Sequence, residues 1–549
     1  MSEPSRQIEI QLGHLCNNRC VFCVSGQLSE RHMASPLPQE PIRAELRAAR
    51  ENGATRVTFV GGEPTLQPSF LDLLRFSVEL DFEEIVLFTN GTMTPRASFR
   101  ERTYAILKAL GPEMARRVIW RFSLQGGTRE AHDLTTGNPG AWDRIQTSLA
   151  VLRAEGARLT GNMCVVASNY ASMLPLCDIA QKFGFENLHF DIVRPRDAGE
   201  RTDEHLRAMM NRYSEMAPEF EALSREVDAR LGPGFDLNFG NMPYCTALSV
   251  AHRIHHDGEA TVTVAAEGDG TSRAGFDKYA DKRTDKRKRP GCAGCVFDGT
   301  CSGVLDKYVQ FHGEGEFVAV TPEALWQRDV AGHHFALLAL PAVRTLAAAG
   351  QMRLVGSDER AGELHVTVGA ATAPWRLTLR RAGREARQQP AQSWALLRAE
   401  RFDAALFGSW PQRPEALTEL RAALDQFAEQ VGSAPVPDAA LAALEPAWQR
   451  HAGGLQRARQ GIAGLCDRLG RQTLAGLRPL GQSRSADGQA AELRFGDDSG
   501  SLVLAVAWEN GSQIPRFRHT VQGLAEARIE SFNRDLGKFL RALSVRPAP

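Results

Sequence analysis

The sequence predicts an α/β protein whose N-terminal part is built on a parallel sheet. Between residues 7 and 194, short runs of β-branched and apolar residues alternate with longer stretches of helical periodicity. This alternation is typical of repeated βα units. The same pattern fits a doubly wound open sheet or six units closed part way into a barrel, and in both folds the functional residues lie at the C-terminal ends of the strands.

Six strands and five helices account for this region. The strand candidates are 7–12, 56–60, 84–88, 118–122, 162–166 and 188–193. The helix candidates lie near 38–52, 68–80, 98–110, 141–155 and 170–183. A further helical stretch near 203–230 ends at Gly232-Pro233-Gly234, where the backbone-breaking residues predict a boundary.

The C-terminal part has weak internal similarity. Trp326-Gln327-Arg328 recurs as Trp448-Gln449-Arg450, each expected to open a helical segment, and Gly362-Glu363-Leu364 resembles Ala491-Glu492-Leu493, each leading into two alternating strands. A helical run follows each set, near 414–431 and 522–543. Repetition at a fixed period predicts two copies of an α+β unit, although chance similarity remains the alternative. The predicted segments are 1–200, 201–239, 240–320, 321–432 and 438–549, with a linker at 432–437.

Composition narrows the partners and the compartment. Lysine plus arginine equals aspartate plus glutamate at 65 each, so we do not expect a nucleic-acid partner. We find no apolar N-terminal signal segment and no run of about 18 apolar residues, so we expect neither export nor a membrane partner. The ten cysteines are grouped at metal-ligand spacing instead of forming a disulfide framework. We therefore expect a cytoplasmic protein.

One cysteine motif decides the chemistry. Cys16, Cys20 and Cys23 follow the first strand with C-x3-C-x2-C spacing. Three thiolates in one loop can bind three irons of a [4Fe–4S] cluster and leave the fourth iron open to a ligand. A zinc site short of one ligand also fits the spacing alone. The neighbouring residues argue for the cluster, because Phe22 precedes the third cysteine and Gly61-Gly62-Glu63-Pro64 follows the second strand.

These motifs resemble the radical S-adenosylmethionine (SAM) superfamily, over residues 7–200 and more loosely over 240–320. The resemblance implies a partial (β/α)6 TIM-type barrel, a [4Fe–4S] cluster on the three cysteines, and SAM bound at the open iron. It also implies reductive cleavage of SAM to a 5′-deoxyadenosyl radical, with electrons from an external donor of flavodoxin or ferredoxin type.

The resemblance assigns SAM contacts to the ends of successive strands. The Gly61–Pro64 segment is expected to bind the SAM ammonium, with glycines allowing close backbone approach and Glu63 supplying charge. Asn90 follows strand three, and Ser123 and Gln125 follow strand four. A further set lies near strands five and six, where an arginine could pair with the SAM carboxylate and where capping roles fit as well: Asn162, Asn169 and Arg194.

A second cysteine set resembles the auxiliary-cluster regions called SPASM and twitch. Cys292, Cys295 and Cys301 have C-x2-C-x5-C spacing, and Cys245 is the candidate fourth ligand of a second [4Fe–4S] cluster. Thr263 and Leu305 replace cysteines of the fuller SPASM pattern, which also has a glycine at Gly258, so two auxiliary clusters are not expected. His312, Asp306 or substrate are alternative fourth ligands, and structural zinc is the alternative metal. We interpret Cys164, Cys177 and Cys466 as packing residues.

The leading functional hypothesis is a radical SAM enzyme that modifies a peptide or protein. A second hypothesis places the same chemistry on a small molecule in cofactor or natural-product biosynthesis. A third, of another class, is a non-catalytic iron–sulfur binding protein, which the intact cysteine loop and Glu63 disfavour. The substrate assignment rests on analogy between folds.

Overall fold

A computed structural model describes residues 6–35, 37–256, 260–267, 271–358, 362–382, 392–485, 490–507 and 516–544. The chain divides into two compact units, Met1–Asp329 and Val330–Pro549. The predicted boundary near residue 320 lies close to this division. Among the described residues, no helix combines the length and apolarity needed to cross a bilayer.

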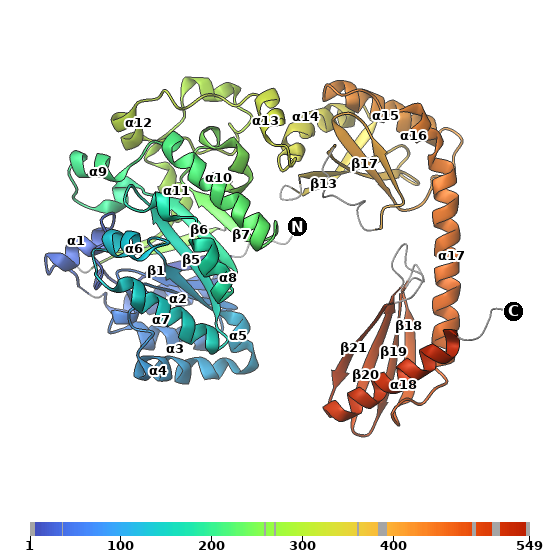
Figure 1. Ribbon diagram of the computed structural model, residues 1–549, viewed down its shortest axis with the longest axis horizontal. Coiled ribbons are helices and arrows are strands. Elements are labelled where there is room, and N and C mark those ends of the chain that lie inside the picture. Colours follow the sequence, from blue (N-terminus) through green and yellow to red (C-terminus); the bar gives the residue numbers. More distant parts are fainter. Residues whose placement is uncertain are drawn as a thin grey trace. The chain divides into compact units, whose positions relative to one another are not determined.

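The N-terminal unit is a mixed α/β structure around one ten-stranded sheet (Figure 1). The strands are β1 (Arg6–Gln11), β2 (Ala54–Val60), β3 (Glu84–Thr89), β4 (Val118–Ser123), β5 (Arg158–Val165), β6 (Asn187–Ile192), β7 (Asp236–Gly240), β8 (Ile254–His255), β9 (Thr261–Ala266) and β10 (Ser272–Asp277). Their order is β10-β9-β1-β2-β3-β4-β5-β6-β7-β8. Because β1 to β8 follow one another in chain order, the sheet is not doubly wound.

All neighbouring strands of this sheet are parallel except the β9–β10 pair. The first six strands confirm the predicted ones to within a few residues. The strands β7 to β10 were not predicted, because a two-residue strand and a short hairpin carry too little periodicity to stand out. Residues 236–277, expected in a connection and a separate module, instead extend the sheet at both edges.

Helices cover the outer face of the sheet. The main ones are α2 (Gln39–Glu51), α3 (Phe70–Glu79), α4 (Ala97–Leu107), α6 (Arg129–Thr136), α7 (Ala141–Ala154), α8 (Leu176–Phe183), α9 (Asp203–Met209) and α10 (Tyr213–Arg230). Side chains alternate along the strands: Ile8 and Ile10 of β1 are buried in the core, whereas Glu9 and Gln11 are half-buried on the opposite face. On β1 the inner face therefore carries polar side chains.

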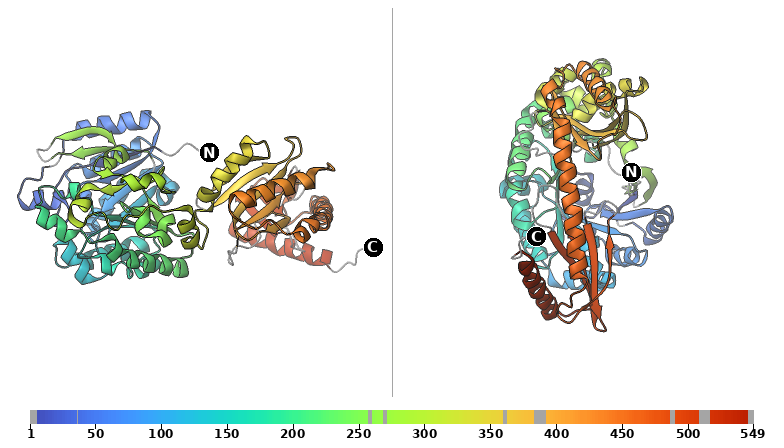
Figure 2. Two further views of the ribbon diagram at one scale, coloured as in Figure 1. Left: turned by 90° about the horizontal axis from the view of Figure 1, so that it is seen from above. Right: turned by 90° about the vertical axis from the view of Figure 1, so that its right-hand side faces the viewer.

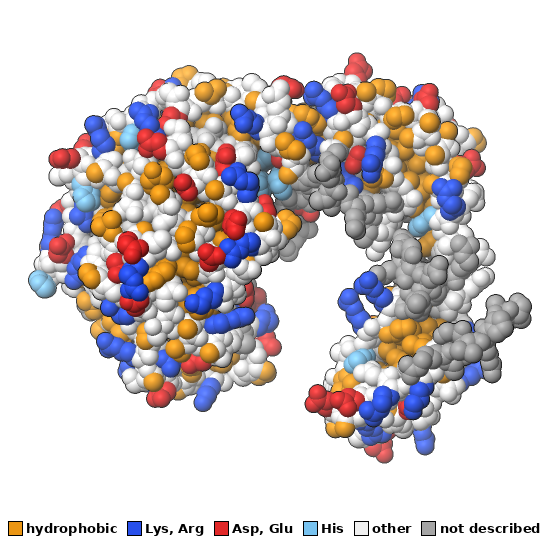
Figure 3. All heavy atoms as spheres, in the orientation of Figure 1, with side chains coloured by type: hydrophobic (Ala, Val, Ile, Leu, Met, Phe, Trp, Pro, Cys, Tyr) orange, Lys and Arg blue, Asp and Glu red, His pale blue; other side chains and the backbone are white. Residues whose placement is uncertain are grey.

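Small elements complete this unit. They are α1 (Val24–Glu30), α5 (Met114–Arg117), α11 (Lys278–Arg283), β11 (Lys286–Arg287), β12 (Val304–Leu305), α12 (Asp306–His312) and α13 (Pro322–Arg328). On the face of this unit shown in Figure 3, acidic and basic side chains are interspersed, in keeping with the zero net charge.

The C-terminal unit contains two antiparallel sheets. The five-stranded sheet has the order β13-β14-β15-β17-β16 and packs against α14 (Phe335–Ala348) and α15 (Ala416–Gln430). The four-stranded sheet has the order β18-β19-β20-β21. The strands of the first sheet are β13 (Met352–Asp358), β14 (Glu363–Val368), β15 (Trp375–Arg381), β16 (Ala395–Arg398) and β17 (Phe402–Phe407). Those of the second are β18 (Arg478–Arg484), β19 (Ala490–Asp497), β20 (Gly500–Ala507) and β21 (Arg516–Gln522). After α16 (Asp438–Ala442), the long helix α17 (Leu444–Leu469) contacts β16 and β19, and α18 (Glu526–Ser544) ends the described chain (Figures 1 and 2).

The internal repeat stays a prediction, and the structure places its matching residues as follows. Glu363-Leu364 begins β14 and Glu492-Leu493 lies in β19, and each of these is the second strand of its sheet. Trp326 and Trp448 are each the fifth residue of a helix, but α13 ends at Arg328 whereas α17 continues to Leu469. The predicted strand at 501–508 is β20, whose last predicted residue lies outside the described residues.

Candidate functional site

The first cysteine loop connects β1 to α1 and is fastened to two neighbouring elements. The Gly62 amide donates to the Gly13 carbonyl (2.7 Å), and the Glu63 amide donates to the Leu15 carbonyl (2.8 Å). On the other side, the Arg19 amide donates to the carbonyl of Thr136 at the end of α6 (2.7 Å). These bonds hold all three cysteines at the C-terminal end of β1.

The three thiols form one electrostatic group. Burial, followed by the nearby Glu63 and Cys23, raises the pKa of Cys16 to about 12. Burial and the neighbouring Cys23 and Cys16 raise the pKa of Cys20 well above its usual value. If these thiols ionise together, a positively charged group must lie among them to offset the repulsion between the thiolates. Within the described ranges, no three Cys, His, Asp or Glu side chains converge on the position of a single metal ion. The loop nevertheless supplies three thiols, which is the ligand set of an iron–sulfur cluster with one open iron.

Glycine is required at positions 61 and 62 because the backbone there packs directly against the backbone of the cysteine loop. A Cβ atom on Gly62 would lie 2.3 Å from the Leu15 carbonyl oxygen and 2.5 Å from that of His14. A Cβ on Gly61, whose φ is +141°, would lie 2.9 Å from the Gly13 carbonyl oxygen. The two glycines therefore let the end of β2 pack directly on the cysteine loop, a role that the sequence reading had given to ligand approach.

Glu63 is a buried hydrogen-bond acceptor that joins two strand ends. Its side chain is 1% exposed. It accepts bonds from the Thr65 hydroxyl (2.5 Å) and amide (3.2 Å), the Thr89 hydroxyl (2.8 Å) and the Asn90 amide (2.7 Å). Burial raises the pKa of Glu63 although these bonds oppose the shift. The carboxylate thereby links β2 to the end of β3, while Pro64 begins a 3-10 turn, Pro64–Leu66.

Asn90 brings the end of β3 to the cysteines. Its side-chain nitrogen, Nδ2, donates to the Asn17 side-chain oxygen (2.8 Å) and lies 4.0 Å from the Cys16 sulfur. Its amide oxygen accepts bonds from the Thr92 amide and hydroxyl (3.0 and 2.7 Å). Phe22 is half-buried against the apolar core. Both predicted residues thus lie at the loop.

The predicted residues on β4 and β5 meet at one sheet edge. Ser123 is paired with Asn162 in the strand register, and both side chains are half-buried. Gln125 is buried, and its side-chain oxygen accepts a bond from the Cys164 amide (3.0 Å). Asn169 donates to the Gln125 and Cys164 carbonyls (3.1 and 2.9 Å). Gln125 and Asn169 therefore hold the backbone that presents Ser123, Asn162 and Cys164.

Arg194 is already paired with acidic side chains. Its guanidinium donates to Asp285 (2.7 Å) and Asp281 (3.1 Å), and Asp197 lies 3.8 Å away. The side chain is 5% exposed. Pairing with the SAM carboxylate remains a prediction for Arg194, and it would require these aspartates to be displaced.

The second cysteine set surrounds one cavity. Cys245, Cys292, Cys295 and Cys301 line a space of about 130 Å³. Three of the sulfurs accept backbone bonds at 3.4 Å, with the amides of Arg289, Val320 and Gly303 donating to Cys292, Cys295 and Cys301 in turn. Burial, then Cys301 and Cys295, raises the pKa of Cys245 to about 12. The fold therefore places the predicted fourth cysteine with the other three.

The alternative fourth ligands have other contacts. His312 bonds to the Met210 carbonyl (2.8 Å), and Asp306 pairs with Arg287. Thr263 lies in β9 and Leu305 is buried in β12. Gly258 lies outside the described residues.

Sequence reasoning missed a polar group on the inner face of β5 to β8. Cys164, expected to be a packing residue like the fully buried Cys177 and Cys466, is instead half-buried at the end of β5. Asp191, Asp197, Cys23 and Cys20 all act on it electrostatically and, after burial, raise its pKa well above the usual value. The Asp191 carboxylate accepts a bond from His189 (2.9 Å), whose ring centroid is 5.0 Å from that of His255. The signal available in the sequence was that polar residues occupy alternate positions of these strands, which indicates a shared polar face.

Comparison with known proteins agrees with this geometry. Residues 10–175 match the model of the Radical SAM superfamily. The chain is 26% identical over 204 residues to AdoMet-dependent heme synthase of Methanosarcina barkeri, covering 37% of this chain and 55% of that protein. It is 25% identical over 198 residues to a probable GTP 3',8-cyclase of Saccharolobus solfataricus, covering 36% and 59%. The chain thus spans little more than half the length of these relatives.

Two solved structures show limited likeness. Streptococcus suis SuiB bound to S-adenosylmethionine has 16% identity and a TM-score of 0.40, covering 58% of this chain and 76% of SuiB. Native anSMEcpe with bound AdoMet and Kp18Cys peptide has 14% identity and a TM-score of 0.40, covering 63% and 100%. The match to the Radical SAM superfamily model covers residues 10–175, the part of the chain that carries the first cysteine loop.

Proposed function

We propose that this enzyme reductively cleaves SAM and uses the resulting radical to modify a peptide or protein. The single observation that carries the proposal is the cysteine loop itself. It lies at the C-terminal end of β1 and packs on the Gly61–Glu63 backbone, beside Asn90. Parallel α/β sheets bind their ligands at this edge. The chain-order strand arrangement supports a partial (β/α)6 barrel.

We assign a [4Fe–4S] cluster to Cys16, Cys20 and Cys23. Three ligands leave one iron open, and when bound such a cluster supplies the electron for cleavage of SAM. The protein contributes hydrogen bonds to the ligand sulfurs, which tune a cluster's potential. The Asn18 amide donates to Cys16 (3.4 Å), and the Asn90 side chain lies beside the same sulfur. Phe22, Ser123, Gln125, Asn162 and Arg194 remain proposed SAM contacts.

We assign a second iron–sulfur cluster to Cys245, Cys292, Cys295 and Cys301. A zinc ion draws four sulfurs to about 2.3 Å from one point. In the described parts of the chain these sulfurs do not converge in that way, and they surround a cavity of about 130 Å³. The spacing favours a larger polynuclear group over zinc.

The peptide substrate is supported by the SPASM-like spacing of the second cysteine set and by the large C-terminal unit. The alternative is a small molecule, favoured by the names of the curated relatives, a heme synthase and a GTP cyclase. All ten cysteines are free thiols, which supports a reducing compartment such as the cytoplasm, where an external flavodoxin or ferredoxin type donor would operate.

The test is anaerobic reconstitution of the full chain, followed by SAM and reductant, with 5′-deoxyadenosine measured by mass spectrometry. We expect cleavage in the wild type and in the control Cys466→Ala, and none in Cys16→Ala. Absence of 5′-deoxyadenosine from a fully iron-loaded wild type would contradict the proposal and favour a non-catalytic iron–sulfur protein.

Metal content tests the second assignment separately. About eight irons per chain would support two cubanes, whereas about four irons with one zinc would support a structural zinc site.

A further inference from the structure

The strands β10 and β11 are paired through the backbone with β9 and β12, whereas helix α11 between them is attached to the sheet mainly by charged and polar side chains. No residue of α11 is buried, and none belongs to the apolar core. The helix therefore has no hydrophobic contribution of the kind that fixes the other helices. Segments of this kind detach locally at low free-energy cost.

Two lysines of α11 reach strands that are far apart in the sheet. The Lys278 ammonium lies 2.6 Å from Glu9 on β1, and the Lys282 ammonium lies 3.7 Å from Asp191 on β6. Four strands, β2 to β5, separate β1 from β6. A helix of six residues is only about 9 Å long. The sheet must therefore curve strongly, and α11 lies across its inner face.

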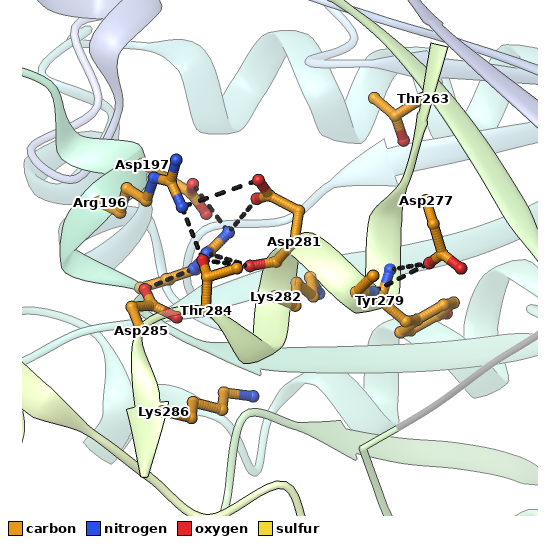
Figure 4. Close-up of polar contacts among 12 residues, drawn as sticks. Arg196, Asp197, Thr263, Asp277, Tyr279, Asp281, Lys282, Thr284, Asp285 and Lys286 are labelled. Carbon is orange, nitrogen blue, oxygen red and sulfur yellow. Dashed lines mark hydrogen bonds and ion pairs between the residues drawn. The ribbon is translucent and has the colours of Figure 1, made fainter.

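One end of the segment is firmly anchored. Arg194, just after β6, bonds to Asp281 (3.1 Å) and Asp285 (2.7 Å), and Arg196 bonds to the Thr284 hydroxyl (2.8 Å). Figure 4 shows Asp281, Thr284 and Asp285 turned toward the segment that contains Arg196 and Asp197. These contacts have the short distances of well-formed charge-assisted bonds.

The contact between Lys282 and Asp191 is looser. The Asp191 Oδ2 atom accepts the His189 bond at 2.9 Å, whereas the contacts of Oδ1 among the described residues are longer: the Asn241 side-chain nitrogen at 3.3 Å and the Lys282 ammonium at 3.7 Å. The neighbouring Lys286 is directed to the Asn241 side-chain oxygen (2.9 Å). Oδ1 can therefore accept a better-placed donor.

The site around Asp191 is built to keep an anion on the inner face. A Cβ at Gly240 would lie 2.1 Å from Asp191 Oδ1, so the glycine makes room for the carboxylate. Burial alone would raise the pKa of Asp191, but Lys282, His189 and His255 hold it well below the usual value. Asp191 is also among the charges that act on Cys164 together with Cys20 and Cys23. In the strand register Asp191 is the partner of Cys164, so it lies at the C-terminal ends of the strands, the edge from which the first cysteine loop also leaves β1.

We propose that Asp191 binds a cationic group of the substrate, an ammonium or a guanidinium, and that Lys282 occupies this position until the substrate replaces it. The inference rests on the proposed function in taking the substrate to be a peptide. Lys282 would then act as an internal ligand that the substrate replaces. The bound lysine or arginine side chain, or the amino terminus, would lie at the same end of the sheet as the loop of Cys16, Cys20 and Cys23.

The experiment measures peptide binding to the iron-loaded full chain by fluorescence anisotropy. The probes are labelled random heptapeptides with one fixed lysine or arginine, and matched pools with acetyl-lysine or citrulline at that position. A hydrogen bond to a charged partner contributes enough for about a tenfold change in affinity. We expect Lys282→Met to bind the cationic pools about tenfold more tightly than the wild type, and Asp191→Asn to bind them about tenfold more weakly.

The matched control is Lys307→Met, which removes an exposed pair with Asp203 (2.8 Å) and should leave binding unchanged. If Asp191→Asn loads iron poorly, the comparison of Lys282→Met with the wild type is sufficient to test the inference. Unchanged or weaker cationic binding in Lys282→Met, or equal binding of cationic and neutral pools, overturns the inference. SAM cleavage by the wild type without peptide reports on the proposed function alone, so the two failures are distinguishable.

Discussion

Replacing Gly62 with alanine should displace the first cysteine loop. The new Cβ would lie 2.3 and 2.5 Å from the Leu15 and His14 carbonyl oxygens, whereas ordinary contact begins near 3.4 Å. One backbone must therefore move by about 1 Å (3.4 − 2.3 = 1.1), and both belong to the site. Overpacking of this kind costs about 1–3 kcal/mol, which is about a 5- to 150-fold change in the ratio of folded to unfolded protein.

The measurements are hydrogen exchange of peptides covering β1 and β2, and iron content after reconstitution. We expect faster exchange and a deficit approaching the irons of one cluster in Gly62→Ala. The matched control is Gly234→Ala, where the added Cβ has nothing within 4 Å and the backbone is not left-handed. If the two variants exchange and load iron alike, the close backbone packing does not hold the cysteine loop.

Three further predictions concern the hydrogen bonds of Glu63, the protonation of His132 and the ligands of the second cysteine set. Thr89→Val removes one hydrogen bond from Glu63 (2.8 Å) and should lower the free energy of unfolding by about 1–3 kcal/mol in denaturant titrations, against little change for the exposed Thr147→Val. Burial lowers the pKa of His132 to about 4. The folded state then binds fewer protons than the unfolded state between about pH 4 and 6.5, so stability should fall on acidification by up to about 3 kcal/mol, and His132→Gln should lose that dependence. Finally, Cys245→Ser should reduce iron content about as much as Cys292→Ser, while Cys466→Ser should keep it; full iron in Cys245→Ser would leave the second set with three protein ligands.

Local sequence patterns were sufficient for the strands and helices of the first six βα units. Each strand carries its own run of alternating or apolar residues, and each helix its own periodicity, so neighbours along the chain contain the information. The cysteine loop and Gly61–Pro64 were found in the same way. The strands β7 to β10 were missed because their pairing with β6 and β1 depends on distant residues.

The roles within the site depended on contacts that spacing cannot encode. The sequence shows a glutamate beside two glycines, but only the fold reveals that Thr65, Thr89 and Asn90 donate hydrogen bonds to its carboxylate. Likewise, the sequence predicts Arg194 as a ligand contact, whereas the fold pairs it with Asp281 and Asp285. Long-range polar pairing is decided by three-dimensional proximity, which a single sequence does not record.

The sequence by itself predicted the chemical class that we propose, because Cys16, Cys20 and Cys23 lie within eight residues of one loop and their spacing is a local property. Tertiary structure decided that Cys245 joins Cys292, Cys295 and Cys301, that Cys164 and Asp191 share the inner face with the first loop, and that α11 crosses that face. The physical reason is that these groups come from separate elements, and only the packing of those elements brings their side chains together.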